Sequence, residues 1–430
     1  MRELGVRQLA AIIFNYTVGS GIFVLPALAA EQLGAAALLA YLVCAVVMGL
    51  MVMCFAEAGS RISATGGPYA YVEAALGPLA GFAAGVLLLV SDLAAAAAVA
   101  TLFASSLGTL IGSTSTSVRA VLVVAVLAAV AAINIQGVRQ GARLVEIFVV
   151  AKLVPLIGFV ILGAAFVRVE HLQWTSTPSA SSVTSTAGIL IFAFIGIEGA
   201  LVPSGEVRNA ARTVPRAAFL AIGAVTILYV AIQVVAQGVL GGALAEDRVA
   251  PLATGAAFIF GPPGRIVMLT GAAISMLGFL SGAVLAGPRC LFAFARDGLA
   301  PRQLASVHTS HHTPHVSIVA YVVIALLLAL SGSFERLAVM TNVASLLVYI
   351  ACAIAVLLLR RRDVRSDGEP FRAPGGPLVP LLACASIVWV LFKTATRVEL
   401  VAVGVTLVLA LIVYGLRGRR RSAGAALRRA

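Results

Sequence analysis

Residues 15–26 read NYTVGSGIFVLP, and in them Gly19, Ser20 and Gly21 interrupt an apolar stretch that also contains Pro26. A membrane-spanning helix of ordinary stability would carry Leu or Ala at these positions, because glycine destabilises a helix interior. Either the glycines allow a neighbouring helix to pack closely, or the helix breaks here. A second stretch of the same kind, further along the chain, favours a break.

The chain has 430 residues, of which 61% are hydrophobic and 11% charged. Soluble domains have about 45–50% apolar and about 25% charged residues, so this composition predicts an all-α integral membrane protein. A span needs about 20 apolar residues, and twelve such stretches predict about 12 transmembrane helices. They are centred near Gly19, Cys44, Leu93, Val126, Leu156, Phe194, Leu228, Leu277, Ile324, Val348, Ile387 and Val408.

The formal net charge of +13 raises the question of a nucleic-acid partner, but the arginines lie mainly on one side of the predicted spans. With the N-terminus in the cytoplasm, the loops on that side and the C-terminal tail hold about three times as many Lys and Arg residues as the opposite loops. This is the bias of the positive-inside rule. It predicts a multi-pass protein of the cell membrane, with both termini in the cytoplasm and no nucleic-acid partner.

Three connections between the spans are informative. The segment 61–77, RISATGGPYAYVEAALG, combines turn residues with a short amphipathic run and predicts an interfacial helix. The segment 241–264 is too long for a turn and too short and polar to span, so we expect an external lid. A linker rich in Pro and Gly at 360–377 separates the last two spans from the ten before them.

Two spans share a pattern that indicates an internal repeat. GSGIFVLP at 19–26 and FIGIEGALVP at 194–203 each place a Gly-Ile step before a proline expected to break the helix, Pro26 or Pro203. Each opens a half of five spans, and because five is odd the halves must be inverted. Such paired, interrupted spans point to the central site of a transporter, although Gly and Pro are also common in membrane helices. The predicted units are the first repeat at 1–168, the second at 183–362, two further spans at 376–417 and a basic tail at 418–430.

The two breaks have a chemical meaning, because lipid cannot satisfy the backbone groups of an unwound helix and breaks therefore line cavities. A break at Gly19–Gly21 would offer N–H groups at a new helix N-terminus, which suit a carboxylate. A break at Ile195–Glu198 would free carbonyl groups, which suit an ammonium. Together they suit the zwitterionic head of an amino acid, and glycine allows it to approach the backbone closely.

These residues resemble the amino acid–polyamine–organocation (APC) transporters, which have a LeuT-like fold of two inverted five-helix repeats with broken helices 1 and 6. GSGIF at 19–23 is similar to the family's carboxylate-binding break, and FAFIGIEGA at 192–200 to its second break. FAEAGSRISATGGPYAYV at 55–72 resembles the family's end of span two, and FAFARDGLAP at 292–301 its loop after span eight. The four motifs in this order extend the resemblance over about residues 5 to 360.

The resemblance implies that backbone at Gly19, Ser20 and Gly21 receives the substrate carboxylate. Phe192 lies where family members carry an aromatic gate that closes over the substrate; the alternative is an ordinary phenylalanine of the core. The ammonium would be received near Gly196 and the end of the first helix segment, by the carbonyl groups of Thr17, Phe192, Ala193 and Ile195.

Ionisable residues inside the membrane are functional candidates, because a charge there is expensive. Lys152 in span five resembles a lysine of the family's proton-coupled branch, placed where sodium-coupled relatives bind a cation. Asp92 in span three resembles a glutamate of that branch, and a pair of this kind can exchange a proton as its surroundings rearrange. We expect protonated Lys152 to donate to backbone carbonyls of the broken first span. The alternatives are a structural salt bridge, or an Asp92 that faces a water pocket.

Other polar residues have less specific meanings. Glu198 lies in the second break, where it can line an inner gate with Tyr349 or cap freed N–H groups. Glu57, at the end of span two, is expected to anchor an interface. The histidine-rich segment HTSHHTPH at 308–315 contains a proline and lies near no Cys or carboxylate, so we expect a solvated loop and no metal site. No cofactor is predicted.

The leading hypothesis is a secondary transporter that takes up amino acids by alternating access with the proton as coupling ion; an exchanger or an exporter is the alternative. A polytopic membrane enzyme would need a cluster of His, Asp or Glu or a phosphate-binding loop, and the sequence has neither. A channel would need repeated filter-like segments, and ATP drive would need a G-x-x-x-x-G-K-[ST] motif. The breaks recognise the head group, which all amino acids share, and so predict no particular side chain.

Overall fold

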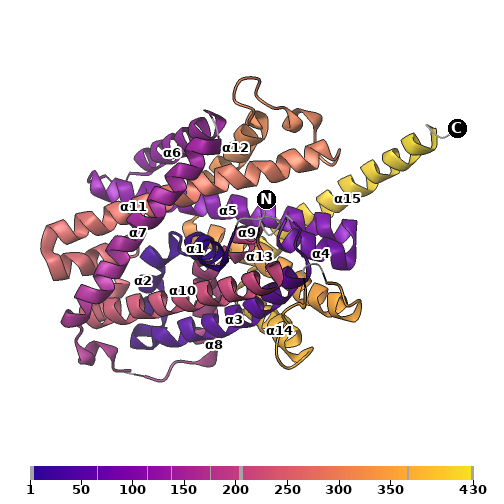
Figure 1. The fold of residues 1–430 in the computed structure, drawn as a ribbon. Helices are drawn as coiled ribbons and strands as arrows, with labels where there is room; N and C mark the ends of the chain where they lie inside the picture. Colours follow the sequence, from indigo (N-terminus) through magenta and orange to yellow (C-terminus); the bar gives the residue numbers. More distant parts are fainter. Residues whose placement is uncertain are drawn as a thin grey trace.

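The protein is described here by a computed structural model, which covers residues 4–64, 66–113, 115–136, 138–174, 176–202, 207–365 and 368–427. The described residues are helical except for connections and one isolated parallel bridge between Leu4 and Val207. The helices pack side by side, and the last of them extends away from the others at one end (Figure 1). The α-helices are α1 Val6–Thr17, α2 Gly21–Leu33, α3 Ala37–Arg61, α4 Pro68–Leu76, α5 Pro78–Leu110, α6 Thr116–Gln136, α7 Val138–Gly163, α8 Ala180–Phe194, α9 Ile197–Ala200, α10 Ala210–Leu240, α11 Pro251–Arg296, α12 His315–Ser331, α13 Phe334–Arg361, α14 Leu378–Thr394 and α15 Arg397–Leu427. Short 3-10 turns are η1 Gly34–Ala36, η2 Ala164–Phe166, η3 Val169–Leu172, η5 Gly241–Ala245 and η6 Arg302–Ala305.

The length and composition of the helices make this a multi-pass membrane protein, as the composition predicts. Eight segments of the described residues are long and apolar enough to cross a membrane, including Pro78–Leu110 and Phe334–Arg361. Three apolar helices are shorter: Ala151–Phe166, His315–Ser331 and Leu378–Thr394. The count of about 12 spans, the inverted repeat and the boundaries of the two halves stay predictions.

The first predicted break is present. Helix α1 ends at Thr17 and α2 begins at Gly21, so Val18, Gly19 and Ser20 connect two helices. Pro26 was expected to break the helix, and this expectation is wrong. It lies inside α2, which continues to Leu33 although the proline has no N–H to donate to the preceding turn.

The second predicted break is also present. Helix α8 ends at Phe194, and the short helix α9 begins at Ile197. Between them Gly196 has φ +135°, a conformation that is open to glycine and strained for other residues. Pro203, the other proline of the predicted repeat, lies outside the described residues.

Two of the three informative connections have the expected character. Helix α4, Pro68–Leu76, occupies the place of the predicted short helix after span two. The linker after α13 is not helical in its described part. The segment 241–264, expected to form an external lid, contains η5 and the first part of α11, which changes direction at Gly261, where φ is +70°. Its position as a lid stays a prediction. Helix α11 begins at Pro251, directly after Ala250. A proline suits the first position of a helix, because the N–H that it lacks would have no partner within the helix there.

Glu57 anchors an interface, as expected. Its carboxylate is fully buried at the end of α3 and accepts from Arg61 at 3.0 Å and from Arg360, on α13, at 2.6 Å. Its second oxygen accepts the N–H of Ala373 at 2.9 Å, and Arg61 reaches the carbonyl of Val364 at 3.2 Å. One carboxylate therefore ties α3 to α13 and to the linker that follows it.

We expect Glu57→Gln to destabilise the fold, because it keeps the shape of the side chain but leaves two guanidinium groups without their carboxylate. Removing one member of a buried ion pair costs about 3–5 kcal/mol. Thermal unfolding of the purified protein in detergent measures the loss. Asp363→Asn is the matched control, since Asp363 pairs with Arg365 at an exposed position and should matter little. Equal melting temperatures for Glu57→Gln and the unchanged protein would contradict a structural role of Glu57.

Candidate functional site

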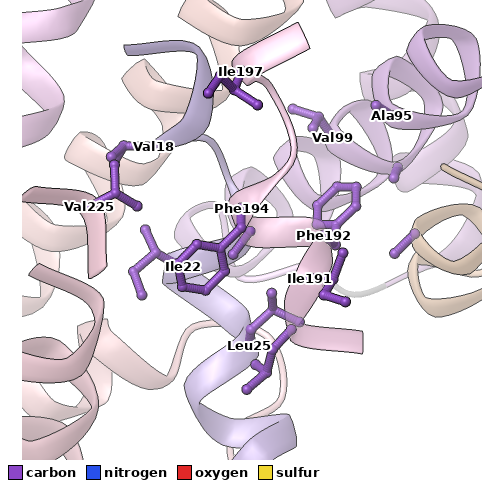
Figure 2. Packing of buried hydrophobic residues seen from close by; sticks show 14 of the residues in the cluster. Val18, Ile22, Leu25, Ala95, Val99, Ile191, Phe192, Phe194, Ile197 and Val225 are labelled. Carbon is purple, nitrogen blue, oxygen red and sulfur yellow. The ribbon is translucent and has the colours of Figure 1, made fainter. Parts of the chain in front are cut away.

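The two breaks lie directly against each other. A Cβ placed on Gly196 would lie 2.6 Å from the carbonyl oxygen of Tyr16, and one on Gly21 would lie 3.2 Å from the Cα of Ala193. The backbones of the two interrupted spans therefore touch at two points. Figure 2 shows side chains from both breaks, among them Ile22 and Phe194, in one buried cluster.

The two glycines of the first break lie in different surroundings. Around a Cβ on Gly21, Leu25 and Ala193 would crowd within 3.1–3.2 Å, so Gly21 allows close helix packing. Around a Cβ on Gly19, the nearest atom is in the ring of Phe279 at 3.9 Å, so Gly19 faces open space. Of the two explanations for the glycine run, close helix packing applies to Gly21, and an open break in the helix applies to Gly19.

Backbone and side-chain donors gather at the first break. Within the described ranges, the hydrogen bonds at this break use the N–H groups of Val18, Gly19 and Phe23, which leaves those of Ser20 and Gly21 for a ligand. The Ser20 hydroxyl is also without a partner among the described residues, although Ser20 is only 1% exposed. A buried donor of this kind is costly unless something accepts from it.

Tyr229 of α10 connects the carbonyl groups of both breaks. Its hydroxyl lies 3.0 Å from the carbonyl oxygen of Thr17 and 2.9 Å from that of Ala193. A tyrosine has one O–H proton and can fully satisfy only one of these carbonyls at a time. The other remains able to accept from a second donor.

A cavity of about 640 Å³ extends from the breaks toward the end of α11. All the predicted substrate-binding residues line it: Thr17, Gly19, Ser20, Gly21, Phe192, Ala193, Ile195 and Gly196. Exposed Arg296 and Asp297 also line it, and they place its mouth at the end of α11. The sequence predicts the wall at the breaks, and the structure adds the wall formed by α5 and α11.

Lys152 of α7 holds the first break, as the sequence predicts. Its ammonium donates to the carbonyl oxygens of Asn15, at 2.8 Å, and Val18, at 2.6 Å, and to the Asn15 side chain at 2.6 Å. The side chain is 4% exposed and lines the cavity. Three N–H donors thus meet three acceptors, which is the full capacity of an ammonium.

Asp92 of α5 lines the same cavity but does not pair with Lys152. Among the ion pairs of the described residues, none joins these two groups. Asp92 instead accepts from the hydroxyl of Tyr321, on α12, at 2.7 Å, while Lys152 uses its donors on the first break. The direct contact between Asp92 and Lys152 that the sequence analysis considers is therefore absent from this conformation. Asp92 faces the cavity instead, which is close to the alternative of an Asp92 that faces a water pocket.

Glu198 makes both of the contacts expected for it, with Tyr349 and with a freed backbone N–H group. One oxygen accepts the N–H of Gly196 at 3.0 Å, which caps the second break, and the hydroxyl of Tyr349 at 2.6 Å. The other oxygen lies 3.4 Å from the hydroxyl of Ser345. Glu198 therefore joins the second break to α13.

Phe192 lines the cavity near the end of α8, next to the second break. Its ring packs edge-on against Phe334, at the start of α13, with a centroid distance of 5.5 Å. The side chain is 8% exposed and packs in the core (Figure 2), and it also lines the cavity.

The histidine-rich segment brings three imidazole rings into contact. His308 lies 4.8 Å from His311 and 5.3 Å from His315 between ring centroids. Within the part of the chain that the structure describes, no group of three or more His, Cys, Asp or Glu residues is arranged to hold a metal ion.

Comparison with known proteins agrees with this geometry. The profile of the amino acid permease family matches residues 4–416. The chain belongs to this family. The match lies within the APC superfamily that the sequence motifs resemble, and it identifies a transporter rather than an enzyme.

Relatives match nearly the whole chain at low identity. A branched-chain amino acid permease of Bacillus subtilis is 25% identical over 98% of this chain and 94% of its own length. A serine/threonine exchanger of the same organism is 27% identical over 98% of both chains. An uncharacterized transporter of Mycobacterium tuberculosis is 31% identical over 97% of this chain and 91% of its own length.

Several residues of the permease site are not apparent from the sequence. Tyr229 and Tyr321 are tyrosines within apolar helices, where a hydroxyl must find a partner, and this signal could have marked them. Arg289 lies inside α11 and lines the cavity, and nothing in the surrounding sequence indicates that it faces a cavity.

We expect Gly196→Ala to reduce the folded fraction of the permease strongly, because its φ of +135° and the 2.6 Å approach to Tyr16 leave no place for a methyl group. Gly19→Val should fold normally, since its side chain would enter the cavity. Size-exclusion profiles and melting temperatures of the purified proteins test the contrast. Gly223→Val, at an exposed helical glycine with nothing within 4 Å, is the control for the substitution itself. A Gly196→Ala protein as stable as this control would contradict the packing of the two breaks.

Proposed function

We propose that this permease is a secondary active transporter that takes up amino acids by alternating access, with the proton as coupling ion. The observation that carries the proposal is the meeting of two broken spans at one end of a cavity that contains Lys152. The relatives named for branched-chain amino acids, and for serine and threonine, support an amino acid as substrate. The two five-helix halves and the two further spans are part of this proposal.

The geometry at the breaks suits the head group of an amino acid. The N–H groups of Ser20 and Gly21 and the orphaned Ser20 hydroxyl are donors for a carboxylate at the start of α2. The Thr17 carbonyl also accepts the N–H of Gly19, so when Tyr229 donates to Thr17 the Ala193 carbonyl is left as an acceptor for the ammonium. The nearby carbonyls of Phe192 and Ile195 supply further acceptors. Donors and acceptors for the two charges thus lie on the two facing backbones.

Lys152 is the proposed coupling group. Loss of its proton removes one N–H donor and the positive charge, so at least one of the acceptors at Asn15 and Val18 loses its partner. Because those acceptors belong to the first break, the protonation of Lys152 and the shape of the substrate site depend on each other. Such linkage is reciprocal. Asp92, with a carboxylate on the same cavity, is proposed to tune the pH response.

The gates are proposed at the two ends of the central site. Phe192, held against Phe334, closes the end away from Arg296. Glu198 and Tyr349 join α9 to α13 on the other side of the second break, so movement of α9 must break or carry along their hydrogen bond. The cavity, which Glu198 also lines, joins the breaks to the mouth at Arg296, and this supports an open inner gate in this conformation.

The bias of the arginines supports both termini in the cytoplasm and a cavity mouth on that side of the cell membrane. A cysteine introduced at Gly418, in the tail, should be protected from membrane-impermeant thiol reagents in intact cells and labelled after permeabilisation. A cysteine at Arg248, in the connection before α11, should react in intact cells. Labelling with the reverse pattern would overturn this orientation.

Uptake into proteoliposomes tests the function directly. Labelled leucine, valine, serine, threonine and arginine should be offered with and without an inwardly directed proton gradient. We expect at least one of them to accumulate, and more so with the gradient. Lys152→Ala should exchange bound substrate but lose accumulation driven by the gradient, and Asp92→Asn should shift the pH dependence of uptake.

Lys393→Ala is the matched control for Lys152→Ala, because Lys393 is a lysine in the last turn of α14, outside the cavity lining. A Lys152→Ala protein that still concentrates substrate with the proton gradient would remove Lys152 from the mechanism. Accumulation that needs a second amino acid inside the vesicles, and no proton gradient, would instead favour an exchanger. The relative named as a serine/threonine exchanger makes this the second candidate.

A further inference from the structure

The cavity contains a guanidinium group that the head-group site does not use. Arg289 lies on α11, before its end at Arg296, and lines the cavity. Among the described residues, no hydrogen bond or ion pair involves its guanidinium, whereas Arg296, at the mouth, pairs with Asp297. An arginine that only holds helices together within a membrane pairs with a carboxylate or a carbonyl. Arg289 is instead presented to the cavity.

A carboxylate lies on the same wall. Asp92 packs against α11 at Gly287, where an added Cβ would lie 2.3 Å from its Oδ2. That oxygen accepts from Tyr321, and within the described ranges the other oxygen has no hydrogen-bond partner. Asp92 and Arg289 both line the cavity, and Arg289 follows Gly287 by two residues on α11. The two opposite charges therefore face one cavity, and within the described ranges no ion pair joins them.

The ligand that fits two such charges carries both charges itself. Guanidinium groups bind carboxylates through two parallel hydrogen bonds, and a carboxylate oxygen is a good acceptor for an ammonium. We propose a second amino acid site in the cavity, between the breaks and the mouth, where Arg289 binds the α-carboxylate and Asp92 the α-ammonium. This inference rests on the proposed function, because it assumes that amino acids pass through the cavity.

The site is distinct from the one at the breaks. That site offers backbone N–H and C=O groups at Ser20, Gly21 and Ala193, whereas this one offers charged side chains of α5 and α11. A substrate that moves from the breaks toward the mouth leaves the partial charges of the backbone groups and meets the full charges of Arg289 and Asp92 before it enters water. The second site therefore holds the substrate in transit and raises its local concentration on the side of the mouth.

Binding measurements can separate the two sites. Equilibrium dialysis of the purified permease with labelled L-leucine and L-serine gives the number of sites and their Kd values. Gly19→Val fills space at the breaks, so it should remove the tighter site and leave weaker binding to the second. In the Gly19→Val background, Arg289→Gln should weaken this remaining binding at least tenfold, and Arg289→Lys, which keeps the charge but loses the bidentate geometry, should weaken it less.

Arg302→Gln is the matched control, because Arg302 lies in η6 at an exposed position outside the cavity lining. All variants must have the size-exclusion profile and melting temperature of their parent. Equal residual binding in Gly19→Val with and without Arg289→Gln would overturn the second site. The second site would also be overturned if Arg289→Gln weakened the binding of labelled L-glutamate alone, because Arg289 would then bind an anionic side chain of the substrate and not the α-carboxylate.

The failure of this inference can be told from the failure of the proposed function. If the unaltered permease neither binds nor transports any amino acid of the uptake panel, the function itself is wrong. If it binds and transports, but Gly19→Val abolishes all binding in a folded protein, the breaks form the only site and the second site is excluded.

Discussion

Backbone groups that are freed inside a membrane must find partners within the protein, and this constraint organises the centre of the structure. Two helices are interrupted at the same place, and lipid can satisfy none of the groups that the interruptions release. The two breaks pack directly against each other, with Gly196 against Tyr16. Lys152 and Tyr229, from neighbouring helices, donate hydrogen bonds to the freed carbonyl groups. The groups that remain without partners face the cavity. The constraint that makes the breaks costly to the fold therefore also places free donors and acceptors at the proposed substrate site.

The partners of the breaks come from helices that lie far apart in the sequence, so the state of the breaks is linked to the packing of the whole bundle. Lys152 is on α7, Tyr229 on α10, and Glu198 connects the second break to Tyr349 on α13. A ligand that takes over a carbonyl from Tyr229, or a proton that leaves Lys152, changes contacts with several helices at once. This arrangement is what a coupled transporter requires, because substrate and ion can influence each other only through an element that both of them contact.

The sequence predicts those features that local chemistry dictates. Glycine runs, a lone lysine and a buried glutamate have strong physical meaning in an apolar chain, and the breaks, the contacts of Lys152 with the first span and the anchoring by Glu57 follow from them. Features that depend on tertiary contacts do not follow. Pro26 stays within α2, where ten consecutive residues, Gly21–Ala30, are buried, and Asp92 bonds to Tyr321 rather than to Lys152. Nothing local distinguishes Tyr229 from another apolar-helix tyrosine until its two carbonyl partners are seen.

Gly19 and Gly21 explain why one motif can serve both fold and function. They are two residues apart in an unwound segment, and so they face different surroundings: Gly21 meets the backbone at Ala193, and Gly19 meets open space beside Phe279. A side chain at Gly21 would push the breaks apart, whereas a side chain at Gly19 would occupy the cavity and leave the packing intact. A substitution at Gly21 would therefore affect stability first, and one at Gly19 would affect access to the proposed substrate site. The separation allows the ligand to approach the backbone at a point where the two spans are already held in register, and binding therefore need not supply the energy of bringing them together.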